Sequence, residues 1–253
     1  MVSRAKDSAS FSSSSSVQTL IAQSAERIIA LLEQGRAKTG LSRSDFFNQV
    51  LRVWDAELRL ADIDEFLNVV CVGVEAAMSE IALAFEELFI QASSNYHDVL
   101  GATFMLANLS WKTVGDEYTP WDLVQLVVRL TLINFKPPQP GDRPITVYDP
   151  CCGSGAFLLG VLDYVDTYYP EVLDRGQVEV YGQELAHTGW LMCRINIRIH
   201  QIARCLRRPW SRQHEETFSP ALVQPKNLQS PVDITIDENL RQKLLASYRE
   251  AIE

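Results

Sequence analysis

"VYDPCCGSGAFLLG", residues Val147–Gly160, is the stretch that decides the fold. A β-branched run from Ile145 ends in Asp149-Pro150, which is typical of a buried strand followed by a turn. An apolar helix is expected directly afterwards, over residues 156–169. Glycines in the turn between them let the backbone approach a ligand closely, and the start of a helix offers free N–H groups with a partial positive charge. The pattern therefore predicts either a ligand-binding turn or a tight strand–helix turn that binds nothing.

A second unit of the same kind follows it. The segment "GQVEVYGQEL", residues 176–185, predicts a strand that ends at Glu184, and residues 186–203 predict a helix. Two strand–turn–helix units with short connections indicate a parallel sheet with right-handed crossovers. Ligands of such sheets bind at the carboxyl ends of the strands, where Asp149 and Glu184 are both expected. A carboxylate at Glu184 is well placed to accept hydrogen bonds from two ribose hydroxyls, while Asp149 can accept from an ammonium group or order a water.

The turn lacks the lysine of the phosphate-binding pattern GxxxxGK[ST]. That absence argues against a nucleoside triphosphate as the ligand.

The first part of the chain has a different pattern of apolar residues, one typical of helices. Apolar residues recur at three- and four-residue spacing over residues 17–34 and 42–61. Gly35 is expected to end the first helix, and Ser and Asp residues are expected to cap the start of the second. Three further segments, 62–70, 73–92 and 99–109, have the same pattern. We therefore expect residues 17–110 to be all helical, after a serine-rich leader (residues 1–16) whose composition cannot build a core.

The remaining residues, 111–253, are expected to form the strand-containing domain. A helix is predicted from Trp121 to about Phe135, capped by Thr119 with Pro120 at its first position, and it is apolar enough to be well buried. A proline-rich connector leads from it to the first strand. Near the end of the chain, residues 232–237 predict one more strand and residues 238–252 a closing helix.

Composition restricts the classes of function. The net charge of −9 argues against a generally basic nucleic-acid-binding protein. The one basic concentration reads either as a nucleic-acid contact or as a solvated face with acidic partners; it comprises Arg194, Arg198, Arg204, Arg207, Arg208 and Arg212. No apolar stretch of about 18 residues is free of charge, and no signal peptide is recognised, so we expect a cytoplasmic protein without a membrane span.

The cysteines have no spacing that suggests a metal site. Of the five, only Cys151 and Cys152 are close together, without the paired spacing of zinc ligands. We interpret them as small buried side chains in a crowded turn, in a protein whose cysteines stay reduced.

Three separated motifs resemble one family. Residues 149–157, "DPCCGSGAF", are similar to the "DPxCGSGxF" signature of adenine-specific (N6) DNA methyltransferases, and most similar to the modification subunits of type I restriction systems. "YTP" at Tyr118–Pro120 resembles a motif that lies beside the methionine end of S-adenosylmethionine in that family. Residues 181–200 resemble its strand-and-helix stretch, with Asn196 and His200 on the helix. The likeness extends over roughly residues 100–203.

The resemblance implies a fold, a cofactor and partners. The expected fold class is α/β, with an S-adenosylmethionine-dependent, Rossmann-like methyltransferase core that is incomplete and is preceded by the helical region. DNA and a specificity or complementary catalytic subunit are the implied partners, and no metal is implied. The cofactor-binding residues that it implies are Tyr118, Thr119, Pro120, Asp149, Pro150, Cys151, Gly153, Ser154, Gly155, Phe157 and Glu184. Asn196 and His200, four residues apart, are interpreted as a partly buried pair with satisfied hydrogen bonds and without a catalytic role.

The sequence also departs from the family. An Asn/Asp-Pro-Pro-Tyr/Phe motif, which polarises the amino group of a flipped adenine and stacks on the base, is not found. "KPPQ" (residues 136–139) and "FSPAL" (residues 218–222) lack its acceptor and its aromatic residue. Catalytic residues are therefore unassigned, and two functions stay open: a methyltransferase completed by a divergent segment or another subunit, and a non-catalytic module that acts in assembly or regulation. A methyltransferase for another substrate is a weaker third hypothesis.

Overall fold

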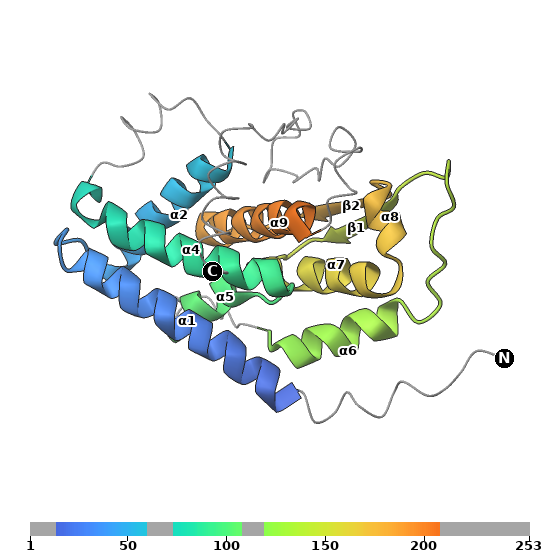
Figure 1. Ribbon diagram of the computed structural model, residues 1–253, viewed down its shortest axis with the longest axis horizontal. Helices are drawn as coiled ribbons and strands as arrows, with labels where there is room; N and C mark the ends of the chain where they lie inside the picture. The colour runs from blue at the N-terminus through green and yellow to red at the C-terminus, as the bar shows by residue number, and fades with distance from the viewer. Residues whose placement is uncertain (1–13, 60–72, 108–118, 208–253) are drawn as a thin grey trace.

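A computed structural model describes residues 14–59, 73–107 and 119–207 (Figure 1). Its first part is helical, as predicted: α1 (Ser14–Arg36), α2 (Arg43–Arg59), the short 3₁₀ helix η2 (Glu75–Ala77), α4 (Met78–Ser94) and α5 (Val99–Leu106). Its second part contains α6 (Trp121–Thr131), β1 (Ile145–Asp149), α7 (Ala156–Tyr168), α8 (Pro170–Asp174), β2 (Val178–Gly182) and α9 (His187–Arg207). The helix predicted at 62–70, Tyr118, the strand at 232–237 and the closing helix lie outside the described residues.

The two predicted strands form a parallel pair. Asp149, the last residue of β1, is in register with Gly182, the last residue of β2. Each strand leads to a helix, α7 after β1 and α9 after β2, although β2 ends two residues before Glu184. The described part is mostly helical, with this small sheet as its strand component.

The expectation that the first strand is buried is wrong. Its residues alternate between partly buried and exposed, and Tyr148 is 56% exposed. The described helices leave that face of β1 open, because α7 is the helix that packs against the pair. Local composition predicts the strand but not how many of its faces are covered.

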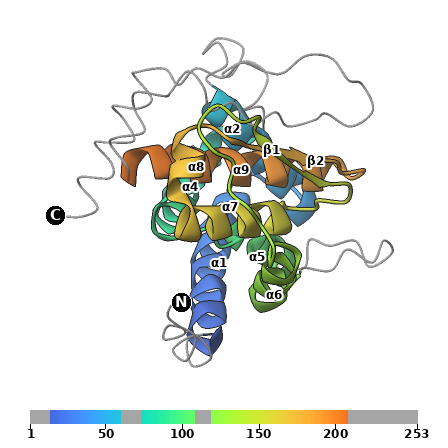
Figure 2. The same ribbon diagram turned by 90° about the vertical axis from the view of Figure 1, so that its right-hand side faces the viewer.

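Helix α9 joins the two parts of the molecule. It packs on α2 and α4 of the helical part and on α7 of the strand-containing part, and both views show it running through the middle (Figures 1 and 2). Ile195, Ile197 and Ile199 are all fully buried, although Ile197 lies on the opposite side of the helix from the other two. A helix that is buried all round belongs to a core, so both parts share one hydrophobic core.

Helix α1 differs from the prediction at both ends. It begins at Ser14, within the predicted leader, and it continues through Gly35 to Arg36. Gly35 therefore does not end the helix. A Cβ atom at this position would lie 3.2 Å from atoms of Phe46, Ala77 and Glu80, so close packing of neighbouring elements explains the glycine.

The start of α2 follows the capping rules read from the sequence. The Asp45 amide donates to the Ser42 hydroxyl over 3.1 Å, and that hydroxyl donates to the Asp45 carboxylate over 2.6 Å. The predicted capped helix is confirmed.

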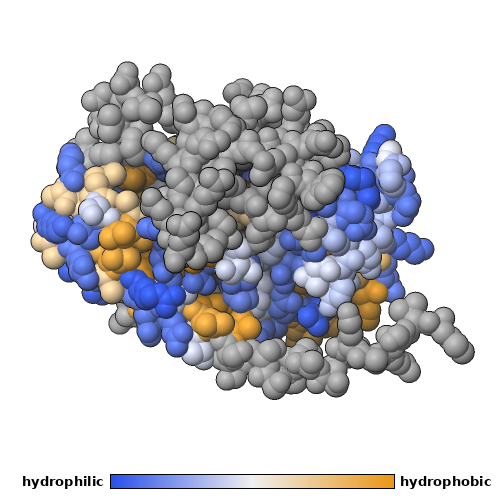
Figure 3. Space-filling model, viewed as in Figure 1, coloured by the Kyte–Doolittle hydropathy of each residue, from blue (hydrophilic) through white to orange (hydrophobic). Residues whose placement is uncertain are grey.

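Helix α6 is less buried than predicted; it begins at Trp121 as predicted but ends at Thr131, about four residues early. Pro120 precedes the helix instead of occupying its first position. One face, with Trp121, Val124 and Val128, packs into the core. Other large apolar side chains are exposed: Leu123, Leu126, Val127, Leu130 and Ile133. Figure 3 shows apolar patches among polar residues on the face seen in Figure 1. None of the described helices is long and apolar enough to cross a membrane.

Shortening a side chain to alanine should affect stability differently on the two faces of α6. Val124 is fully buried and packs against Gly160 of α7, whereas Leu130 is 60% exposed. We expect Val124→Ala to lower the free energy of unfolding by about 2 kcal/mol and Leu130→Ala by less than about 0.5 kcal/mol. Urea denaturation of both variants measures this difference. Equal losses would show that a further segment covers Leu130.

Candidate functional site

The loops that follow the two strands are joined by main-chain hydrogen bonds. Beyond the last strand pair, the Gln183 amide donates to the Asp149 carbonyl and the Cys152 amide donates to the Gln183 carbonyl, both over 2.9 Å. These two bonds continue the pairing of β1 and β2 into their loops. As a result, Glu184 lies beside the glycine-rich turn that follows β1.

Two carboxylates bind amides of this same turn. Asp149 Oδ1 accepts from the Cys151 amide over 3.0 Å, and Glu184 Oε2 accepts from the Gly153 amide over 3.0 Å. The other Glu184 oxygen accepts from the Ala186 amide over 2.8 Å, just before α9. Asp149 and Glu184 therefore converge on one turn, as expected from their positions at neighbouring strand ends.

The two glycines of the turn have different surroundings. Gly153 has a φ of +53°, and no heavy atom lies within 4 Å of the position where its Cβ would be, so its outer side is open. Gly155 has a φ of +91°, and a Cβ there would lie 2.9 Å from Sγ of Cys193 in α9. Gly153 thus faces open space, whereas Gly155 is needed for the turn to pack on α9. Ligand approach explains a glycine at position 153 but is not needed to explain one at position 155.

The start of α7 presents main-chain N–H groups without side-chain caps. Gly155 is the N-cap and supplies no side chain, and the first intrahelical bond runs from the Leu159 amide to the Gly155 carbonyl over 2.9 Å. The amides of Ala156, Phe157 and Leu158 therefore have no intrahelical acceptor. Together with the partial positive charge of the helix end, they suit a negatively charged group.

The other predicted site residues surround this turn unevenly. Pro150 and Cys151 are exposed, so the expectation that both cysteines are buried is wrong for Cys151 and confirmed for Cys152. Phe157 is partly buried against the core. Thr119 and Pro120 precede α6, which packs on α7, but no hydrogen bond among the described residues joins them to the turn.

Sequence reasoning missed a buried carboxylate behind the turn. Asp98, just before α5, is fully buried and accepts from the Gly101 amide (2.7 Å), the Asn196 side-chain amide (2.8 Å) and the Ser154 hydroxyl. Burial raises the pKa of Asp98, although these three hydrogen bonds oppose the shift. The available signal was local: an aspartate that caps an apolar helix. Nothing in the sequence pattern connects it with Ser154.

Neighbouring His97 is held neutral. Burial lowers the pKa of His97 to about 4, and its ring contacts Trp121 edge-on at 5.3 Å between centroids. It therefore adds no positive charge beside Asp98 near pH 7.

The burial predicted for the pair on α9 is confirmed. Asn196 is fully buried and also donates to the Ser154 carbonyl over 2.8 Å. His200 is 2% exposed and stacks on Tyr96 at 5.3 Å.

The arginines of α9 that the structure describes do not form a solvated basic face. Arg194 pairs with Asp55 over 2.8 Å and lies over the Trp190 ring. Arg204 is 5% exposed and binds Asp166 (3.0 Å) and Asp174 (2.7 Å). Arg198 is buried as well. The acidic partners expected for these arginines are therefore present, but the side chains lie in the interior and not on a solvated face, which also opposes a nucleic-acid contact. Arg208 and Arg212 lie outside the described residues, as does the side chain of Arg207.

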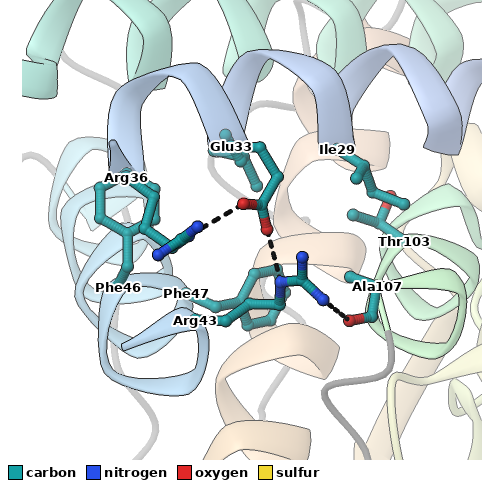
Figure 4. Close-up of a pocket in the computed structure, with 9 residues that line it drawn as sticks. Ile29, Glu33, Arg36, Arg43, Phe46, Phe47, Thr103 and Ala107 are labelled. Carbon is teal, nitrogen blue, oxygen red and sulfur yellow. Dashed lines mark hydrogen bonds and ion pairs between the residues drawn. The ribbon is translucent and has the colours of Figure 1, made fainter. Parts of the chain in front are cut away.

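A separate small hollow, with a volume of about 20 Å³, lies in the helical part (Figure 4). Glu33 stands between Arg36 (2.9 Å) and Arg43 (2.5 Å), and Arg43 also donates to the Ala107 carbonyl. These two arginines hold the pKa of Glu33 below its usual value despite its partial burial. The charged groups of the hollow are thus paired with one another, and the hollow contains none of the predicted site residues. The lining residues are Ile29, Leu32, Glu33, Arg36, Arg43, Phe46, Phe47, Thr103 and Ala107.

Comparison with known proteins identifies a family that the sequence of this chain matches. The model of the N-6 DNA Methylase family matches residues 96–234, more than half of the chain, and the match includes Asp98, the glycine-rich turn and Glu184. The chain belongs to the N-6 DNA methylase family. The resemblance seen in the three sequence motifs is therefore confirmed.

Two curated relatives agree with this family. The chain is 33% identical over 118 residues to the type I restriction enzyme MpnII methylase subunit of Mycoplasma pneumoniae, which covers 47% of the chain and 19% of that protein. It is 30% identical over 122 residues to the type I restriction enzyme MjaVII methylase subunit of Methanocaldococcus jannaschii, covering 48% and 18%. The chain thus matches about a fifth of the length of these methylase subunits.

A solved structure was also found: the methyltransferase subunit of a type I restriction-modification system from Streptococcus thermophilus. The match covers 73% of this chain and 56% of the solved chain, with 14% sequence identity and a TM-score of 0.39. A likeness of this degree does not by itself define the fold.

Proposed function

We propose that this N-6 DNA methylase chain binds S-adenosylmethionine at the glycine-rich turn, as part of a type I system that methylates adenine in DNA. The observation that supports this most is the convergence of Asp149 and Glu184 on the amides of one turn beside the open start of α7. In open α/β sheets this edge is the usual place for a nucleoside ligand.

The residues present fit this cofactor. The free amides at the start of α7 suit its methionine carboxylate. Each Glu184 oxygen already accepts one amide, and a carboxylate oxygen has two lone pairs, so Glu184 can still accept hydrogen bonds from ribose hydroxyls. Asp149, which is half-buried, keeps acceptor capacity for the ammonium group. The open side of Gly153 leaves room for the ligand to approach the backbone.

The part of this chain in methyl transfer is orientation. S-adenosylmethionine supplies the methyl group when it is bound. Holding its sulfonium end in line with an attacking amino group converts a bimolecular step into an effectively unimolecular one. The acceptor adenine must be flipped out of the duplex and held by stacking and hydrogen bonds. Because these 253 residues lack the Asn/Asp-Pro-Pro-aromatic motif, we place that task on another segment or subunit, alongside a specificity subunit that selects the DNA site.

The missing motif also supports a second candidate function. A chain that keeps the cofactor turn without a base-binding motif suits a non-catalytic module that serves assembly or regulation. Tritium transfer from S-adenosylmethionine to DNA separates the two. Incorporation into adenine that requires a partner subunit supports the first function, and its absence with every partner present supports the second.

Cofactor binding is tested by calorimetric titration of wild type and Asp149→Ala. We expect wild type to bind. We expect the dissociation constant of the variant to be about tenfold to hundredfold larger, because a charge-assisted hydrogen bond within the turn is lost. Asp142→Ala is the matched control: Asp142 is exposed, lies just before β1, and also binds one main-chain amide, that of Gln139. Absence of heat with wild type, or equal affinities for wild type and Asp149→Ala, would refute the proposed site.

A further inference from the structure

Asp98 links the helical part of the molecule to the glycine-rich turn. It is the N-cap of α5, and its Oδ1 accepts from the Gly101 amide, as a helix cap does. The same oxygen accepts from Asn196 of α9, and Oδ2 accepts from the hydroxyl of Ser154, 56 residues further along the chain. One fully buried side chain therefore joins α5, α9 and the turn.

Both ends of Ser154 are held by this link. Its hydroxyl donates to Asp98, and its carbonyl accepts from the Asn196 side-chain amide over 2.8 Å. Asn196 Nδ2 also donates to Asp98, so the side chains of Asp98 and Asn196 form a closed hydrogen-bonded ring with the hydroxyl and the main-chain carbonyl of Ser154. Ser154 lies between the two glycines of the turn, where the backbone is otherwise most free to move.

Gly101 makes room for this arrangement. A Cβ at this position would overlap Oδ2 of Asp98 and would lie 2.6 Å from Oγ of Ser154. The first turn of α5 thus carries a glycine where the Asp98–Ser154 contact passes closest to its backbone. Helix propensity alone favours alanine over glycine, so the close approach of these side chains explains the glycine better.

We propose that Asp98 is a positioning residue: from the helical region it fixes Ser154, and through Ser154 the conformation of the glycine-rich turn. This inference rests on the proposed function insofar as the turn holds S-adenosylmethionine. The helical part of the molecule then contributes a positioning residue to the cofactor site. A turn held in its bound shape before the ligand arrives binds more tightly, because less ordering accompanies binding.

Three variants separate this role from helix capping. Ser154→Ala removes the link to the turn and leaves the cap of α5 intact. Asp98→Ala removes both. Asp98→Asn keeps an acceptor for Gly101 and Asn196 and donates to the Ser154 hydroxyl, so it should restore the link. Ser42→Ala is the control, because it removes the cap of α2 outside the turn.

The first measurement is amide hydrogen exchange in the free protein. The Gly153, Gly155 and Leu159 amides all donate within or next to the turn. We expect their exchange to be about tenfold faster in Ser154→Ala and faster still in Asp98→Ala, with Asp98→Asn and Ser42→Ala close to wild type. Wild-type exchange in both Ser154→Ala and Asp98→Ala would overturn the proposal, whether or not the protein binds a cofactor.

The second measurement is the dissociation constant of S-adenosylmethionine. We expect it to rise about fivefold to tenfold in Ser154→Ala, more in Asp98→Ala, and less than about threefold in Asp98→Asn. If wild type binds and Ser154→Ala binds equally well, the positioning role is refuted while the proposed function stands. If wild type does not bind, the proposed function is refuted and the exchange result still decides the role of Asp98.

Discussion

Replacing Gly155 by alanine is expected to lower the free energy of unfolding by about 3 kcal/mol. The residue has a φ of +91°, which costs a residue with a side chain about 1–2 kcal/mol. The new Cβ would also lie 2.9 Å from Sγ of Cys193, and overpacking of this kind costs about 1–3 kcal/mol. Urea denaturation followed by circular dichroism gives the value.

Gly153→Ala is the matched control for that substitution. Gly153 also has a positive φ, +53°, but nothing lies near its missing side chain. Only the cost of the positive φ applies here, so we expect the free energy of unfolding to fall by about 1 kcal/mol. Equal losses at both positions would show that Gly155 does not pack on α9 as described.

Arg204→Met is expected to cost about 3–5 kcal/mol of stability. Its guanidinium binds two carboxylates and the Pro170 carbonyl, and its side chain is 7% exposed. Removing it takes a charged partner from Asp166, whose side chain is 13% exposed and also accepts a hydrogen bond from Tyr96. The loss of one partner from a largely buried ion pair accounts for the size of the effect.

The result for Arg204 also tests how the basic residues of α9 are used. Arg129→Met, at an exposed position of α6, serves as the control and should change stability by less than about 0.5 kcal/mol. If Arg204→Met were as mild as Arg129→Met, Arg204 would not be held in the interior by Asp166 and Asp174 as described. Thermal and urea unfolding of the two variants decide the matter.

Much of the fold was predictable because its signals are local. Strand β1, the glycine-rich turn and helix α7 follow one another within about 25 residues, each with its own composition. The parallel pairing of β1 with β2 follows from the short connections and the handedness of crossovers. The meeting of Asp149 and Glu184 then follows from geometry, because parallel strands end at the same edge of a sheet.

The features that sequence reasoning missed depend on neighbours distant in the chain. Gly35 has the appearance of a helix stop, but its surroundings come from α2, η2 and α4. The apolar residues of α6 predict a buried helix, yet burial depends on what covers each face. Arg204 has the appearance of a surface residue until Asp166 and Asp174 are placed beside it.

Asp98 is the clearest case of this limit in the site itself. Its three hydrogen-bond donors are at positions 101, 154 and 196, and only the first is near in sequence. Local pattern reading detects a helix cap and nothing more. The family match begins at residue 96 and includes Asp98, so it takes in the end of the helical region together with the glycine-rich turn.

The most direct test of the central claim is hydrogen exchange of the wild-type protein with and without saturating S-adenosylmethionine. The account predicts new protection at Ala156, Phe157 and Leu158, whose amides have no intrahelical acceptor in the free protein, and at the neighbouring turn. Protection confined to the hollow around Arg43 and Phe46, or unchanged exchange throughout residues 149–158, would contradict it.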